Sequence, residues 1–288
     1  NIDDDIFDEL AAITDYDFDS DLNVNILGHI FEQSISDLEE FRAGISDEAV
    51  DSKKGKRKKD GIFYTPEFIT KYIVENTIAP WLEDRKKELG IMYLPELTED
   101  DLKSVQLSNK RKKDFNKKIE KHLNFWNSYK EKLKNIKILD PACGSGAFLV
   151  QAFDFLQREG QTVNNTISDL FGGQTGTEDL DRNILSNNLY GGDLNSESVE
   201  ITKLSLWIKT ANKFSQLTIL KDNIKCGNSL IDDPAIAGEK AFKWGKEFPE
   251  IIESGGFDIV IGNPPYGAYL TDYEKQYYQK SAVSFQGN

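Results

Sequence analysis

The sequence predicts an α/β protein with a doubly wound, mostly parallel sheet that follows a helical region. From residue 136 onward, short apolar runs suited to strands buried on both faces alternate with stretches of helical spacing. A glycine-containing turn joins the first of these runs to the helix after it, at the edge of the sheet where such folds bind ligands. Before residue 136, apolar side chains recur at helical spacing.

The N-terminal part of the chain is expected to be helical. In residues 1–45, apolar side chains lie at helix-like spacing and acidic side chains cover the other face. Thr65 is the expected N-cap of the next helix, with Pro66 at its first position and the helix continuing over residues 67–78. Residues 81–134 are polar and rich in lysine. They include an amphipathic helix with its apolar positions at Leu123, Phe125, Trp126, Tyr129 and Leu133.

Four apolar runs mark the expected strands of the sheet. They are residues 136–139, 188–190, 217–220 and 257–261. Helices are expected between the first three runs, over residues 147–158 and 196–214. Residues 164–187 are rich in glycine, asparagine and threonine, so an inserted loop is expected there.

The chain divides into three expected regions, and its charge is unevenly spread. Residues 1–60 form an acidic helical segment ending in a basic loop, residues 61–134 form a helical region, and residues 135–288 hold the sheet. Residues 1–52 contain 16 acidic side chains and one arginine, whereas residues 53–134 contain 21 basic and 13 acidic ones. The total charge of −14 therefore describes the N-terminal segment, and it does not exclude a DNA partner.

Composition excludes several classes of protein. Hydrophobic residues make up 39% of the chain, which is enough for a packed core and excludes wholesale disorder. The sequence has no apolar run of about 18 residues and no signal peptide at its start. Cys143 and Cys226 are the two cysteines, and with two histidines they favour neither a disulfide framework nor a zinc site. We therefore expect a cytosolic protein without a metal.

The segment 140–148, Asp-Pro-Ala-Cys-Gly-Ser-Gly-Ala-Phe, lies between the first expected strand and its helix. Gly144 and Gly146 permit a tight turn and a close approach of a ligand to the main chain. A dinucleotide loop reads Gly-x-Gly-x-x-Gly, because a pyrophosphate needs a bare helix N-terminus. Here Leu149 stands at the third glycine position and the acidic Asp140 precedes the turn. Both departures favour a ligand that carries positive charge.

A second acidic residue is expected beside this segment. Residues 190–194 end the second expected strand, which places Asp193 at the same edge of the sheet. A carboxylate there can accept hydrogen bonds from the two hydroxyl groups of a ribose. Asp193 follows Asp140 by 53 positions, whereas the compact fingerprint has about 20. The expected insertion at 164–187 accounts for the excess.

The tetrapeptide 263–266, Asn-Pro-Pro-Tyr, follows the last expected strand. Two prolines at the exit of a strand end the ladder and leave carbonyl groups without a sheet partner. The side-chain oxygen of Asn263 and the carbonyl of Pro264 are then placed to accept both hydrogens of one planar amino group. Such acceptors stabilise the positive charge that develops when this nitrogen attacks an electrophile. Tyr266 offers a face on which a base can stack, a contact worth about 1–3 kcal/mol.

These motifs, in this order, resemble those of the S-adenosylmethionine-dependent N6-adenine DNA methyltransferases. More narrowly, residues 25–288 resemble the methylase region of Eco57I-like, type IIG restriction-modification enzymes. The resemblance is carried by Phe-Tyr-Thr-Pro at 63–66 and by the segments 140–148, 190–194 and 263–266. It implies a Rossmann-like class I methyltransferase sheet, incomplete at its C-terminal end. The implied reaction is direct transfer of a methyl group from S-adenosylmethionine to N6 of an adenine flipped out of double-stranded DNA.

The resemblance also implies a set of site residues. Those that close over, cradle or pack beneath the methionine part of the cofactor are Tyr64, Thr65, Pro66, Asp140, Ala142, Gly144, Gly146 and Phe148. Those on its ribose and adenine side are Asp193, Leu194 and Asn228, the last at a position where the family usually has aspartate. The catalytic residues are Asn263, Pro264, Pro265 and Tyr266, and no metal is required.

Members of this family continue with further strands and a target-recognition domain, whereas this chain ends 22 residues after Tyr266. We therefore expect a fragment of a bacterial or archaeal protein, with weak or absent methylation on its own. Residues 1–52 are either the connector to an upstream nuclease or a solubilising helical cap.

Two other functions stay open. One is N-methylation of protein glutamine or RNA guanine, and the other is a non-catalytic DNA-binding or assembly module that uses the basic region 53–134.

Overall fold

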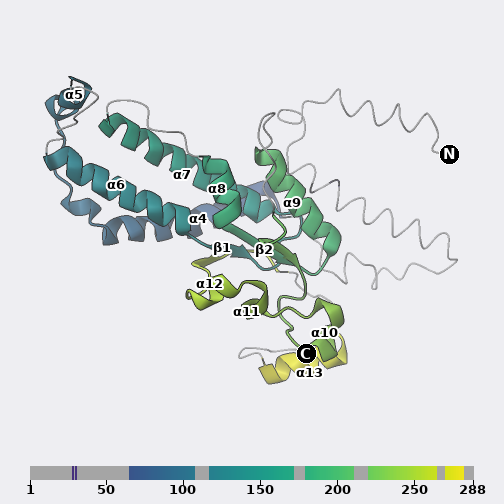
Figure 1. Cartoon of the computed structure of the whole chain (residues 1–288). Helices are drawn as coiled ribbons and strands as arrows, with labels where there is room; N and C mark the ends of the chain where they lie inside the picture. The colour runs from purple at the N-terminus through teal and green to yellow at the C-terminus, as the bar shows by residue number, and fades with distance from the viewer. Residues whose placement is uncertain are drawn as a thin grey trace, which may run out of the picture.

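The computed structural model describes residues 65–107, 117–171, 179–210, 220–264 and 270–281, together with Gly28 and Ile30; the side chains of 104–107 are not described. Figure 1 shows a small central sheet with a layer of long helices on one side and short helices on the other. The acidic segment, the basic loop at 53–59, and Tyr64, Pro265 and Tyr266 lie outside the described residues.

The sheet has four parallel strands in the order β3-β2-β1-β4. They are β1 (Ile138–Asp140), β2 (Leu189–Asp193), β3 (Ile224–Cys226) and β4 (Ile259–Val260). Parallel neighbours need crossover connections, which the helices between β1, β2 and β3 supply. The predicted α/β class with a parallel sheet, as in a Rossmann-like methyltransferase, is confirmed.

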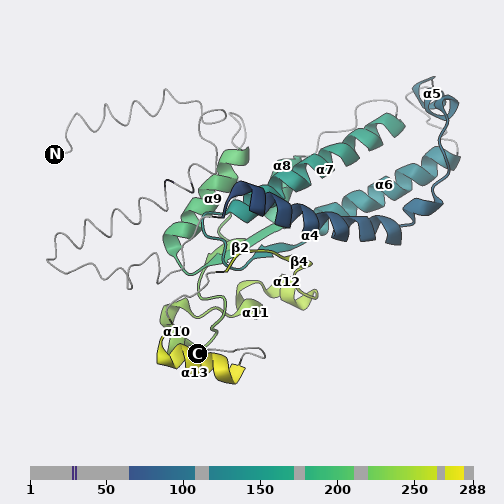
Figure 2. The same ribbon diagram turned by 180° about the vertical axis from the view of Figure 1, so that it is seen from behind.

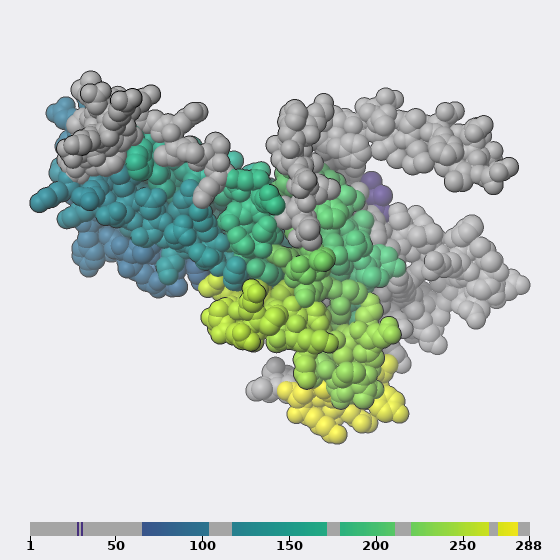
Figure 3. Space-filling view, in the orientation of Figure 1, coloured from purple at the N-terminus to yellow at the C-terminus, as the bar shows by residue number. Residues whose placement is uncertain are grey.

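The helices fall into a long set and a short set. The long set is α4 (Glu67–Glu88), α5 (Glu99–Leu107), α6 (Lys117–Asn135), α7 (Ala147–Phe171), α8 (Leu180–Asn187), α9 (Ser196–Thr210) and α13 (Asp272–Ser281). The short set is Ile91–Tyr93, α10 (Pro234–Ala237), Gly238–Lys240, α11 (Trp244–Glu247) and α12 (Pro249–Glu253). In Figure 3, the yellow-green surface of α10–α13 gathers on the side of the molecule away from α4–α8.

One hydrophobic core joins the sheet to α4, α6 and α7, which lie side by side in Figures 1 and 2. The predicted amphipathic helix is confirmed as α6, where Leu123, Phe125, Tyr129 and Leu133 are buried. The hydroxyl group of Tyr129 donates a hydrogen bond to Glu159 of α7 at 2.7 Å. A smaller aromatic cluster, formed by Tyr190 with residues of the short set of helices, covers the other face of the sheet. The two layers explain why the central strands β1 and β2 are buried on both faces.

Two predictions about residues between the strands are wrong. Residues 164–171 continue α7 and residues 180–187 form α8, so these parts of the predicted insertion are helical. Burial of Ile167, Leu170, Ile184 and Leu185 outweighs the weak helix propensity of the surrounding asparagines and threonines. The third strand is β3 at 224–226 rather than 217–220. Of the predicted run, Leu220 is buried ahead of a turn, and residues 217–219 lie outside the described part of the chain.

The boundaries of the predicted helix after Thr65 also change. Helix α4 begins at Glu67 and extends to Glu88, ten residues beyond the predicted end, with Pro80 inside it. Pro66 occupies the N-cap position and the cap has no side-chain hydrogen bond, so Thr65 is not the N-cap. Helix α9 is described over Ser196–Thr210, and residues 211–214 of the predicted helix lie outside the described part of the chain.

Two buried asparagines fix the amino ends of the strands. Asn188, just before β2, places its side-chain nitrogen 2.8–3.2 Å from three carbonyl oxygens, those of Leu133, Lys134 and Ile136. Asn223, just before β3, does the same with the carbonyls of Leu185, Ser186 and Leu189. Each asparagine thus ties the end of a helix to the start of the neighbouring strand.

Replacing Asn188 by leucine is expected to destabilise the fold by about 1–3 kcal/mol, because buried carbonyl groups lose their donor. Urea unfolding followed by circular dichroism measures the change. Asn187→Leu is the matched control, since the Asn187 side chain makes an exposed hydrogen bond to Asn183. Equal unfolding midpoints for the two variants would contradict this role of Asn188.

Candidate functional site

The site lies at the carboxyl ends of β1, β2 and β4. Asp140 is the last residue of β1 and pairs in register with Gly191 of β2. On the other side, the main-chain nitrogen of Ile261 donates to the carbonyl of Leu139 at 2.9 Å. A Cβ atom on Gly262 would lie 2.7 Å from Oδ1 of Asp140, so Gly262 has no room for a side chain. The ends of the three strands therefore bring residues 140, 193 and 263 to one edge of the sheet, as predicted from their order in the chain.

The glycine loop (residues 140–148) is fixed to β2 and α9 by hydrogen bonds. The main-chain nitrogen of Cys143 donates to the carbonyl of Gly192, and that of Gly144 donates to Oδ2 of Asp193, both at 2.9 Å. Gly146 has φ of 88°, and a Cβ atom on it would lie 3.1 Å from the Thr202 side chain. Glycine is therefore required at this position both for its conformation and for the close packing of α9.

The Asp140 carboxyl group is buried in this loop and incompletely paired. Its Oδ1 accepts a hydrogen bond from the main-chain nitrogen of Ala142 at 3.1 Å, whereas its Oδ2 is buried without a partner among the described residues. Burial raises the pKa of Asp140 to about 7, and the nearby charge of Asp193 adds to the effect, while the Ala142 hydrogen bond opposes it. A buried polar atom without a partner is costly. The free oxygen therefore marks where a donor group of a ligand would be stabilised.

Asp193 joins the glycine loop to the end of β2. Its Oδ1 accepts a hydrogen bond from the main-chain nitrogen of Asn195 at 2.8 Å, in addition to the Gly144 hydrogen bond on Oδ2. These two main-chain donors fix the carboxylate at the edge of the sheet. Leu194 follows with 36% of its surface exposed. The loop after β3 lies alongside, because the main-chain nitrogen of Gly227 donates to the carbonyl of Asp193 at 2.8 Å.

Asn228 is half-buried in this loop, next to Asp193 in space. Its side-chain oxygen accepts a hydrogen bond from the main-chain nitrogen of Leu230 at 3.1 Å. Its main-chain nitrogen donates to the carbonyl of Lys240. The amide thus stabilises the turn, which places Asn228 at the same edge of the sheet as Asp193. Phe148, in contrast, is 4% exposed and belongs to the hydrophobic core beneath the loop.

The upstream and downstream motifs meet at a side-chain hydrogen bond. The Asn263 side-chain nitrogen donates to the Thr65 hydroxyl oxygen at 3.3 Å, although the residues are 198 positions apart. Thr65 is 8% exposed, whereas Asn263 and Pro264 are exposed. The structure therefore brings the described parts of the two motifs together at the edge of the sheet.

Three further residues support the glycine loop without having been predicted. Thr202 donates from its hydroxyl group to the carbonyl of Gly144 at 2.8 Å, and Ser205 donates to that of Ser145 at 3.3 Å. Gly28 is buried and helical, and a Cβ atom on it would lie 2.8 Å from the Ser145 hydroxyl oxygen. The two α9 residues could have been predicted from their spacing, because buried small polar side chains recur on one face of that helix.

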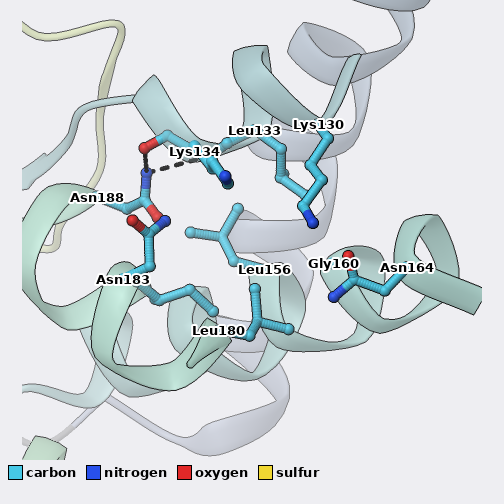
Figure 4. Close-up of a pocket in the computed structure, with 10 residues that line it drawn as sticks. Lys130, Leu133, Lys134, Leu156, Gly160, Asn164, Leu180, Asn183 and Asn188 are labelled. Atoms are coloured by element: carbon cyan, nitrogen blue, oxygen red, sulfur yellow. Dashed lines mark hydrogen bonds between the residues drawn. The ribbon is translucent and has the colours of Figure 1, made fainter. Parts of the chain in front are cut away.

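A small cavity elsewhere in the molecule cannot be the site. It has a volume of about 20 Å³ and lies between α6, α7 and α8, where Figure 4 shows Asn188, Leu156 and Leu180 at its wall. Such a volume holds about one water molecule. It lies next to the amino ends of the strands, where Asn188 precedes β2, and thus away from the glycine loop.

The described residues contain neither a cluster of metal ligands nor a helix that could span a membrane. No group of three or more histidine, cysteine, aspartate or glutamate side chains gathers to hold a metal ion in the part of the chain that the structure describes. Every helix described there is too short or too polar to cross a lipid bilayer.

Comparison with known proteins gives one family and several relatives. Residues 187–288 match the model of the Eco57I restriction-modification methylase family. A protein described as a type II restriction enzyme and methyltransferase in Methanocaldococcus jannaschii is 31% identical over 73% of this chain. The type II restriction enzyme and methyltransferase RM.Eco57I of Escherichia coli is 32% identical over 52% of it. The adenine-specific methyltransferase PglX of Lacticaseibacillus casei is 24% identical over 90%.

The chain spans only a small part of these relatives. The matched regions cover 17% of the first two proteins and 19% of the third. The family match begins just before β2 and includes Asp193, Asn228 and the tetrapeptide 263–266. Similarity to restriction-modification methylases is therefore found both by the family model and by the relatives. The resemblance to Eco57I-type restriction-modification methylases that the motifs indicated is therefore confirmed, with the family match itself confined to residues 187–288.

Proposed function

We propose that this chain forms the core of a DNA adenine-N6 methyltransferase of a restriction-modification enzyme, and that its cofactor is S-adenosylmethionine. The observation that carries the proposal is the position of Asn263 and Pro264, which are exposed after β4 and directly follow Gly262, the residue that lies against the buried Asp140. The names of the relatives, which include adenine-specific methyltransferases, support the choice of acceptor. In this proposal, residues 61–134 contain the motif that closes over the cofactor, and residues 135–288 form the catalytic core.

The residues at the edge of the sheet fit such a cofactor. When bound, S-adenosylmethionine supplies an electrophilic methyl group on a positively charged sulfur. The unpartnered Oδ2 of Asp140 suits its ammonium group, and Asp193, held at the end of β2, suits the hydroxyl groups of its ribose. Ala142, Gly144 and Gly146 would line its amino-acid part through the main chain. Thr65, Pro66, Leu194 and Asn228 would complete the pocket, together with Tyr64.

The acceptor side would be formed by the tetrapeptide 263–266. The Asn263 side-chain oxygen and the Pro264 carbonyl would accept the two hydrogens of the adenine amino group. These acceptors favour the transition state, because positive charge develops on that nitrogen as it attacks the methyl group. Tyr266 would stack on the base after it leaves the duplex. Further domains of the protein would then be needed to recognise the DNA sequence.

The thiol in the glycine loop is a poor candidate for a covalent enzyme intermediate. Cys143 is buried in the glycine loop, and burial raises the pKa of its thiol, with the charges of Asp193 and Asp140 adding to the effect. A thiol that stays protonated is a poor nucleophile. This supports direct transfer of the methyl group to adenine.

Calorimetric titration with S-adenosylmethionine tests the cofactor part of the proposal. We expect one molecule bound per chain, and no binding to correctly folded protein would contradict the proposal and favour a non-catalytic module. The acceptor is then tested with radiolabelled cofactor and matched amounts of DNA, RNA and protein. We expect label in DNA only, whereas label in protein glutamine or RNA guanine would replace the proposed acceptor.

A further inference from the structure

We infer that Thr65 is a positioning residue that holds the Asn263 amide in the orientation needed for methyl transfer. The inference rests on the proposed function, because it assigns Asn263 the role of accepting a hydrogen from the amino group. It adds a role for the Thr65 hydroxyl group that is separate from cofactor contact. The observation behind it is the 3.3 Å hydrogen bond from the Asn263 side-chain nitrogen to the Thr65 hydroxyl oxygen.

Thr65 is held rigidly enough to serve as a reference point. It is buried and immediately precedes α4, whose first turn begins with hydrogen bonds from the main-chain nitrogens of residues 69 and 70 to the carbonyl of Pro66. The buried face of α4 packs into the main core through Val74, Ile78 and Leu82. A hydrogen bond of 3.3 Å from Gln151 of α7 to Glu67 fixes the first turn further.

Asn263, in contrast, stands on an exposed segment. It follows β4, a strand of two residues, and Gly262 just before it has no side chain to pack. Among the described residues, the hydrogen bond to Thr65 is the contact that holds its side-chain amide. Loss of the Thr65 hydroxyl group would therefore leave the amide free to rotate.

The orientation of the amide decides whether Asn263 helps or hinders the reaction. An asparagine side chain has an acceptor oxygen on one side and a donor NH₂ group on the other. With the NH₂ group directed to Thr65, the oxygen is left for the hydrogens of the substrate amino group. Rotation of the Asn263 amide by 180° would direct its NH₂ hydrogens at the hydrogens of the substrate amino group, and the two groups would repel each other. The Thr65 hydrogen bond thus selects the productive orientation.

Two variants of Thr65 separate the hydroxyl group from the shape of the side chain. Thr65→Val keeps the shape and removes the hydroxyl group, and we expect kcat to fall about tenfold at saturating cofactor and DNA. Thr65→Ser keeps the hydroxyl group and should restore most of the rate. Thr77→Val is the matched control on α4, because the Thr77 hydroxyl group donates only to the carbonyl of Ile73. The control should leave kcat unchanged.

A double-mutant cycle and cofactor binding give the decisive comparison. If Thr65 acts through Asn263, then Thr65→Val should have no further effect on kcat in protein that already carries Asn263→Ala. Additive losses would overturn the inference. So would a Thr65→Val variant that binds S-adenosylmethionine more weakly in calorimetry but keeps the wild-type kcat at saturation, because Thr65 would then act as a cofactor ligand alone.

A measurement without catalysis separates this inference from the proposed function. In ¹⁵N-edited spectra, the Asn263 side-chain amide is identified as the NH₂ pair missing from Asn263→Ala. We expect that pair to shift or broaden in Thr65→Val and to stay in place in Thr65→Ser. If the protein fails to methylate adenine and the pair still behaves this way, the proposed function fails and the Thr65–Asn263 link stands. An unmoved pair in Thr65→Val would overturn the link itself.

Discussion

Replacing Asn263 by alanine is expected to lower kcat for DNA methylation on the order of 10²–10³-fold, the usual cost of one lost group that stabilises a developing charge. In the proposed reaction, the side-chain oxygen is needed when positive charge develops on the amino nitrogen, whereas the cofactor would be held by Asp140, Asp193 and the glycine loop. The dissociation constant of S-adenosylmethionine should therefore stay close to that of the wild type. Single-turnover methylation with radiolabelled cofactor and calorimetric titration measure the two effects.

Asn76→Ala is the matched control for this prediction. It removes an amide from an exposed asparagine of α4 that donates only to the carbonyl of Tyr72. The control should keep both the methylation rate and cofactor binding. An Asn263→Ala variant that methylates at the wild-type rate would remove Asn263 from the catalytic machinery.

The second large effect is expected for the pH dependence of cofactor binding. Asp140 holds a proton up to a pKa of about 7 in the folded protein, well above its ordinary value of 3.8. An ammonium group beside the carboxylate favours the ionised form, so binding below pH 7 must release this proton. We expect affinity for S-adenosylmethionine to fall by up to about tenfold for each pH unit below 7. Calorimetry in buffers of different ionisation enthalpy measures the released proton directly.

Asp140→Asn should abolish this proton release and weaken binding above pH 7, where the wild-type carboxyl group is ionised. Asp154→Asn is the control, because Asp154 lies on α7 outside the glycine loop and pairs with Lys209 on α9. On binding the cofactor, Asp154→Asn should release the Asp140 proton as the wild type does. Cofactor affinity in the wild type that stays constant between pH 5.5 and pH 8 would contradict the assignment of Asp140.

The same raised pKa predicts how the stability of the ligand-free protein depends on pH. Between about pH 4 and pH 7, the folded protein holds a proton on Asp140 that the unfolded chain has lost. The Asp140 contribution to the free energy of unfolding is therefore fully present below pH 4 and is lost as the pH rises through 7. Asp140→Asn should consequently be more stable than the wild type at pH 8, by on the order of 4 kcal/mol. Urea unfolding at pH 5 and pH 8 measures the difference.

Local patterns were sufficient to predict the parts of the fold that have regular apolar spacing. The centre of the sheet and α6 were predicted because each buries a repeating apolar face, as in Leu123 and Tyr129. Strand β3 was missed because it is a short edge strand, Ile-Lys-Cys, with only its first residue buried. Residues 164–171 and 180–187 were misread because tertiary packing, not local propensity, makes them helical.

The candidate site could be predicted as a set of motifs but not as an arrangement. Parallel strands end at one edge, so Asp140, Asp193 and Asn263 could be brought together from their order alone. No local pattern could predict that Oδ2 of Asp140 has no partner, because this depends on how the glycine loop closes. The Thr65–Asn263 hydrogen bond joins residues 198 positions apart, which also lies beyond any sequence period.

The central claim, that these residues methylate adenine in DNA, is tested most directly by mass spectrometry of DNA nucleosides. DNA is taken from cells free of other adenine methylases that express the protein carrying this chain. We predict N6-methyladenine in that DNA and none in DNA from cells that express the Asn263→Ala variant at the same level. A folded wild-type protein that binds S-adenosylmethionine but leaves the DNA without N6-methyladenine would contradict the claim.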